Sequence, residues 1–160
     1  MEVYLCLIWI DGAQRVLLWQ SDPDRIVLDS EGFAVSFATP GDAHDAVTGR
    51  GWALGEEHPS RYELDAIEVW CKSSAVGGEW TELLNAWNLF LDLDVGEKLF
   101  RAADRRLLSS GTYDKVFHAC NLPAMTAEGE HYIPRWSAAE LAGLRQLLLL
   151  GLAELRAHLR

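Results

Sequence analysis

Two apolar runs near the start of the chain, residues 3–10 and 15–20, are separated only by a short polar stretch that includes Asp11 and Gly12. Both runs are rich in β-branched and aromatic residues, which is typical of β-strands. A two-residue hairpin turn of the primed type needs positive φ angles, which Asp and Gly tolerate better than most residues. The pattern therefore predicts an antiparallel hairpin and limits this part of the chain to β-structure.

Further strand-like runs follow the hairpin at residues 25–29 and 33–38, and residues 52–54 could form one more strand. The connections between the first four runs are short, which is typical of strands that follow one another in a sheet. The sequence therefore predicts an N-terminal antiparallel β-meander of three to five short strands.

From residue 40 onward the apolar residues recur mostly at three- and four-residue spacing, which indicates helices. Ser137 and Glu140 form a capping-box pattern ahead of a leucine-rich run, which predicts a long C-terminal helix. Residues 113–136 have no clean period and are expected to be ordered but irregular. Shorter helices are expected in residues 42–49, from about 65, in 79–93 and in 97–108.

These patterns together predict an α+β fold in which the N-terminal meander packs with four or five helices. The 160 residues contain 49% hydrophobic and 24% charged residues, which is close to the globular average. Neither an internal repeat nor a linker divides the chain. We therefore expect residues 1–160 to form a single domain.

The three cysteines, Cys6, Cys71 and Cys120, are odd in number and form no CxxC pair. Buried free thiols are the simplest interpretation, and they predict a reducing compartment. The sequence contains no signal-peptide pattern, in which a positively charged start precedes an apolar run and a cleavage site. It also contains no apolar stretch long enough to span a membrane. We therefore expect a cytoplasmic protein that does not act at a membrane.

Acidic residues are concentrated in the first 98 residues, which carry a net charge of −12, whereas residues 99–160 carry +2. Such a surface favours a basic partner and repels nucleic acid and anionic membranes. Trp80, Trp87 and Tyr62 lie near these acids in the sequence and are candidate anchors for a partner. The acidic residues predicted to bind the partner are Glu56, Glu57, Asp65, Glu68, Glu79, Glu82, Asp92 and Asp94.

Catalytic patterns are weak throughout the sequence. His118, Cys120 and His131, with Glu128 or Glu130, are the components of an alternative hypothesis, a small hydrolase, but Cys120 lacks the helix N-terminus or neighbouring cation that activates a thiol. The same histidines and glutamates are ligand types for zinc but lack a compact metal spacing. We therefore predict no enzyme activity, no metal and no cofactor.

Two stretches carry a family resemblance. The first is LLNAWNLFLD at residues 83–92, and the second runs from YDKVF at 113–117 through NLPAMT at 121–126 to EGEHYIPRW at 128–136. They resemble a family of small acidic bacterial proteins similar to the immunity proteins of polymorphic and contact-dependent toxin systems. The resemblance assigns no roles to its motif residues, which include Trp87, Asn88, His118, Asn121, Glu128, Glu130 and His131.

The resemblance implies an immunity-type protein that binds and neutralises a cognate toxin. The partner predicted from the charge is a basic toxin domain of the nuclease type, bound through the acidic surface without turnover. A second alternative is an interaction module that mimics nucleic acid and occupies a host nucleic-acid-binding protein. Direct binding of nucleic acid is not expected, because aromatic residues interleaved with Lys and Arg are missing.

Overall fold

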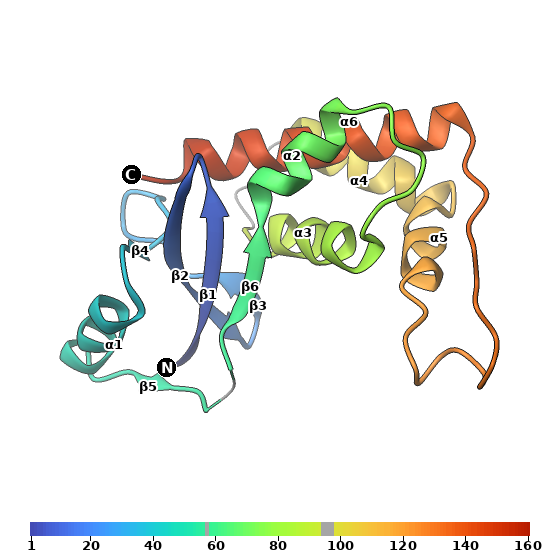
Figure 1. The fold of residues 1–160 in the computed structure, drawn as a ribbon. Coiled ribbons are helices and arrows are strands. Elements are labelled where there is room, and N and C mark those ends of the chain that lie inside the picture. Colours follow the sequence, from blue (N-terminus) through green and yellow to red (C-terminus); the bar gives the residue numbers. More distant parts are fainter. Residues whose placement is uncertain (57, 94–97) are drawn as a thin grey trace.

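The first two strands, β1 (Glu2–Ile10) and β2 (Ala13–Ser21), form an antiparallel hairpin in the computed structural model (Figure 1). The φ angle is 54° at Asp11 and 73° at Gly12. Both turn residues therefore lie in the left-handed region that a primed two-residue turn requires, and the predicted hairpin is confirmed.

The structure describes residues 1–56, 58–93 and 98–160. Four shorter strands complete the sheet: β3 (Asp24–Ile26), β4 (Ser36–Phe37), β5 (Ala53–Leu54) and β6 (Ser60–Glu63). β3 and β4 pair antiparallel with β2, whereas β5 and β6 pair in parallel with β1. The sheet is therefore mixed, because the chain passes through a helix before it returns to β1, and such a crossover brings a strand back in the parallel direction.

Six helices lie in the described ranges: α1 (Pro40–Gly49), α2 (Leu64–Lys72), α3 (Trp80–Asp92), α4 (Lys98–Ser109), α5 (Thr112–Ala119) and α6 (Ala138–Ala157). At the start of α6, Ser137 Oγ accepts a hydrogen bond from the Glu140 N–H, and Glu140 Oε2 accepts one from the Ser137 N–H. The α+β class, the capping box and the long C-terminal helix are thus confirmed. None of the helices that the structure describes is long and apolar enough to cross a membrane.

Helix α5 corrects the prediction that residues 113–136 are irregular. Gly111, with a φ angle of 75°, separates α5 from α4, and the buried residues Thr112, Val116 and Ala119 share one face of the helix. Eight residues offer too few repeats for a helical period to be recognised in the sequence. Residues 120–136 contain neither helix nor strand, so the prediction is confirmed for this part.

Helices cover both faces of the β1–β2 hairpin (Figure 1). Successive side chains of a strand point to opposite faces, and here Val3, Val16 and Leu18 pack with α1 on one face. Ile8 and Leu17 belong to the larger core on the other face, which α2, α3 and α6 complete. Burial on both sides explains why β1 and β2 are almost continuously apolar instead of alternating with polar residues.

Helix α3 is joined to α4 and α5 by polar contacts inside the core. The fully buried Trp87 donates its indole N–H to Asp104 Oδ1 of α4 at 2.9 Å, and Asp104 is only 6% exposed. The Tyr113 ring of α5 meets Trp87 edge to face at 4.9 Å, and its hydroxyl donates to Asn88 Oδ1 at 3.0 Å. These bonds give partners to the buried indole of Trp87 and to the half-buried phenol of Tyr113.

The residues that follow α6 are fastened to the N-terminal part of the chain. The Ala34 N–H donates to the His158 carbonyl at 2.8 Å, and Arg15 Nη1 donates to the Arg160 carbonyl at 2.6 Å. The Arg160 guanidinium lies over the Phe33 ring, 3.9 Å from its centroid. Residues 158–160 therefore contact both strand β2, through Arg15, and the loop before β4, through Phe33 and Ala34.

Gly151 of α6 provides a test of the packing between α6 and α3. A Cβ atom at Gly151 would lie 2.1 Å from Cδ2 of Phe90, whereas one at Gly143 of the same helix would meet only the end of Leu107, at 3.0 Å. Alanine favours a helix over glycine by about 1 kcal/mol, but overpacking a rigid ring costs about 1–3 kcal/mol. Because a contact of 2.1 Å places the cost in the upper part of this range, we expect Gly151→Ala to lower the free energy of unfolding in urea by a net amount of about 1–2 kcal/mol.

Gly143→Ala is the matched control, because the flexible end of Leu107 can rotate away. We expect it to be more stable than Gly151→Ala in the same urea titration. Equal stabilisation by the two alanines would contradict the close contact between Gly151 and Phe90.

Candidate functional site

The structure separates the acidic residues that the sequence predicts as one binding surface. Glu57 and Asp94 lie outside the described residues. Glu56 is exposed after β5, and Glu79 is exposed immediately before α3. The other four lie on two helices: Asp65 and Glu68 on α2, and Glu82 and Asp92 at opposite ends of α3.

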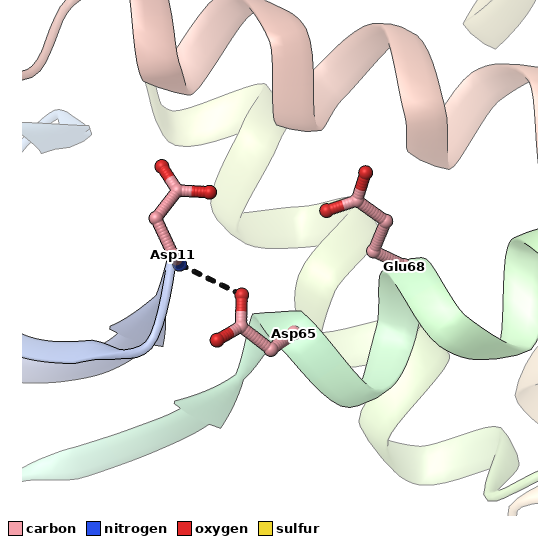
Figure 2. Close-up of side chains that lie close together, drawn as sticks. All are labelled: Asp11, Asp65 and Glu68. Carbon is pink, nitrogen blue, oxygen red and sulfur yellow. Dashed lines mark hydrogen bonds between the residues drawn. The ribbon is translucent and has the colours of Figure 1, made fainter.

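Asp65 and Glu68 are used inside the fold, where they meet Asp11 of the hairpin turn (Figure 2). The Asp65 carboxylate accepts the backbone N–H groups of Asp11 and Gly12, each at 2.8 Å. Arg156 of α6 bridges the other two acids, with Nη2 2.7 Å from Asp11 Oδ1 and 2.5 Å from Glu68 Oε2. This cluster therefore joins the hairpin, α2 and α6.

The ligand atoms of Asp11, Asp65 and Glu68 lie within 4.8 Å of one another, as they would around a metal ion. The Arg156 guanidinium already supplies the positive charge that these carboxylates need. The turn N–H groups also use both oxygens of Asp65. We therefore interpret Asp11, Asp65, Glu68 and Arg156 as a structural junction, named the Arg156 junction, in which the Asp65 and Glu68 carboxylates are already bonded within the fold.

The pKa of Glu68 is lowered from 4.5 to about 2, first by the hydrogen bond from Arg156 and then by the one from Lys72. A carboxylate with a lowered pKa stabilises the folded state fully above its unfolded pKa, and this contribution is lost as the pH falls toward the folded value. We expect the free energy of unfolding, measured by urea titration, to fall more steeply between about pH 5 and pH 2 in the wild type than in Glu68→Gln.

The control for this experiment is Glu56→Gln, which removes an exposed carboxylate. Its pH profile should follow that of the wild type. If the Glu68→Gln profile also ran parallel to the wild type, the bridge through Arg156 would contribute nothing to acid stability.

A pocket of about 180 Å³ opens where β1, β2 and β6 meet the end of α3. Tyr4 and Trp19 are cross-strand neighbours on β1 and β2, and their ring centroids are 5.6 Å apart. The Trp19 indole N–H donates to Asp92 Oδ2 at 3.0 Å, so a carboxylate from α3 is held against an aromatic wall. The pocket is lined by Tyr4, Leu5, Cys6, Trp19, His58, Ser60, Tyr62 and Asp92.

The electrostatics of this pocket favour a positive charge. Burial raises the pKa of Asp92, the nearby Asp24 carboxylate raises it further, and the bond from Trp19 lowers it. Burial also raises the pKa of Tyr62 to about 12. Cys6, Asp92 and Glu82 add to this effect, whereas a hydrogen bond with Ser60 opposes it. The described lining residues include neither Lys nor Arg, and His58 is the one imidazole among them.

Cys6 of the pocket lining is not a nucleophile at neutral pH. Burial raises the pKa of its thiol to about 12, and Asp92 adds to this effect. A reactive cysteine needs a lowered pKa, because the thiolate is the nucleophile. The described lining of the pocket therefore contains no activated thiol.

A second cavity, of about 400 Å³, lies between α5 and the irregular segment. Asn121 shapes this segment, because its side chain accepts the Tyr132 N–H at 2.6 Å and donates to the Tyr132 carbonyl at 2.9 Å. His118 and His131 line the cavity with Glu130. Phe117, Leu122, Met125, Thr126 and Tyr132 complete the lining.

The described residues around this cavity include no activated thiol of the kind that the hydrolase alternative requires. The Cys120 thiol donates to the Val116 carbonyl at 3.3 Å, and burial raises its pKa. His118 Nδ1 lies 2.7 Å from the Asp114 carbonyl, and Glu128, Glu130 and His131 are exposed. Among the described residues, the one group with metal-ligand spacing is the Arg156 junction, so these histidines and glutamates do not converge on a zinc site.

Several motif residues of the sequence have structural roles. Trp87 and Asn88 hold the helices together, and Asn121 closes the loop to Tyr132. Trp87 is fully buried and cannot anchor a partner, which corrects that expectation. Trp80 is half-buried in a row with Trp70 and Trp136.

The residues that sequence reasoning missed are Trp19, Tyr4 and His58 of the small pocket. They lie on separate segments, and Trp19 and Asp92 are 73 positions apart. The short β6 strand, which carries Tyr62, was not expected either. The one available signal was the two-residue period of strand side chains, which places Tyr4 on the face of β1 that carries Cys6 and Trp19 on the face of β2 that carries Leu17.

Comparisons with models of known protein families, with curated proteins and with solved structures give no match to this chain.

Proposed function

We propose that this chain is an immunity-type protein that binds a basic bacterial toxin domain of the nuclease type and neutralises it by covering its cationic surface. The observation that carries the proposal is the half-buried Asp92 carboxylate in an aromatic pocket, with Asp24 and Glu82 close enough to act on the pocket electrostatically. The net charge of −10 adds a long-range attraction for a basic partner.

The binding surface proposed here is narrower than the acidic surface predicted from the sequence. Asp65 and Glu68 are excluded because Arg156 and the hairpin turn use them. The remaining surface consists of the pocket and the acids around it, including Glu2, whose Oε2 accepts the Tyr4 hydroxyl at 3.2 Å. We name this surface the acidic pocket face and define it by the pocket lining with Glu2, Asp24 and Glu82.

Binding through this face requires no turnover. Carboxylates around the pocket accelerate the encounter with a basic domain and fix its orientation, and half-buried aromatic side chains supply contact area. Tyr62 keeps the anchor role predicted for it, and Trp19 and Tyr4 take the place of the predicted Trp80 and Trp87. The unpaired thiols of Cys6, Cys71 and Cys120 support a cytoplasmic site of action, where thiols stay reduced.

The proposal is tested by expressing the gene next to the coding sequence of this chain, with and without the chain. We expect the neighbouring product to arrest growth alone, and co-expression to restore growth and yield a stable complex. Growth arrest that persists despite co-expression would contradict the proposal. A complex with a host nucleic-acid-binding protein in place of a toxin would support the mimic alternative instead.

The acidic pocket face is tested by reversing two of its charges in Asp24→Lys/Glu82→Lys. We expect this variant to bind the toxin domain at least about tenfold more weakly, mainly through slower association, because steering depends on these charges. Surface plasmon resonance at ionic strengths of about 0.01 and 0.15 M would measure the association rates of the wild type and the variant. Screening at the higher ionic strength should reduce the difference between these two rates.

The matched control is Asp45→Lys/Glu128→Lys, which changes the net charge equally on α1 and on the irregular segment. Both side chains are exposed. Equal weakening by the two double variants would mean that the net charge, and not the acidic pocket face, controls binding.

A further inference from the structure

We infer that the pocket at the end of α3 is a receptor for one arginine side chain of the partner, with the guanidinium stacked on the aromatic wall and bonded to the Asp92 carboxylate beside it. This inference rests on the proposed function and deepens it, because it names the group that the acidic pocket face recognises.

The size of the pocket limits its occupant to one side chain. Its volume of about 180 Å³ is well below the roughly 300–1,000 Å³ of sites that hold whole small molecules. A nucleotide or an oligosaccharide is therefore too large. The head group of a single long side chain from a docked protein is the occupant that this volume favours.

The chemistry of the walls selects a cation. Asp92 is half-buried, and a carboxylate that has lost water is costly unless a positive charge or several hydrogen bonds compensate it. Trp19 supplies one hydrogen bond, and an ionised carboxylate can accept several. Asp24 acts on Asp92, and Glu82 acts more weakly on Tyr62, so both acids add to the negative potential around the pocket.

The aromatic residues favour arginine over lysine. Tyr4 and Trp19 stand 5.6 Å apart by ring centroid, and Tyr62 lines the same pocket from β6. A planar guanidinium stacks on aromatic faces, is weakly hydrated and donates to a carboxylate through two parallel N–H groups. An ammonium group is more strongly hydrated and lacks this planar match.

The test is titration of the ¹⁵N-labelled protein with N-acetyl-L-arginine methylamide, followed through the Trp19 indole N–H resonance in NMR spectra. This resonance reports directly on the Asp92 contact. We expect a saturable shift with the arginine amide. The citrulline amide, which has the same shape without the charge, should bind at least about tenfold more weakly, and the lysine amide should fall between them.

Two variants locate the site. Asp92→Asn keeps the size of the side chain and should abolish saturable binding, while the other indole resonances report that the fold is intact. Asp24→Asn removes an exposed carboxylate outside the lining and should weaken binding by about twofold. Asp45→Asn on α1, whose side chain is 91% exposed, is the control and should leave the titration unchanged.

Equal binding of citrulline and arginine amides, equal binding of lysine and arginine amides, or a saturable shift that survives Asp92→Asn would overturn the arginine assignment. The absence of any Trp19 shift would overturn it as well. Arginine binding without growth rescue would leave the pocket assignment standing and reject the toxin partner. Growth rescue that Asp92→Asn does not affect would reject the pocket and leave the immunity role standing.

Discussion

The burial of the β1–β2 hairpin on both faces is the constraint on which the rest of the structure depends. A pair of strands with apolar side chains on both faces cannot leave either face in contact with water. Both faces must therefore be covered by helices. Helix α1 does this on one face, and α2, α3 and α6 do it on the other. The small pocket lies at the edge of this second layer, where the end of α3 supplies Asp92 instead of an apolar side chain.

The sequence contains enough information for the elements whose signals are local. The turn at Asp11 and Gly12 and the capping box at Ser137 each depend on a few neighbouring residues, and both predictions are confirmed. Strand β6 and helix α5 were missed, because a segment of four or eight residues shows too little of its period. Their conformations depend on packing against β1 and α3.

The candidate site was harder to predict than the fold, because charge counts do not show which acids are already paired. Asp65 and Glu68 looked the same in the sequence as Glu82 and Asp92. The difference comes from Arg156, which is 88 residues away from Glu68, and from the hairpin turn. Only the tertiary structure separates acids that hold the fold together from acids that face a pocket.

The attachment of the C-terminal residues to the first strands has a consequence for biosynthesis. Arg15 and Arg160 are 145 positions apart, so this contact closes only after residue 160 has left the ribosome. Until then the larger face of the nascent hairpin lacks α6 and exposes apolar surface, which makes partly made chains prone to aggregate. Synthesis of α6 and of residues 158–160 is thus needed before the hairpin has all of these contacts.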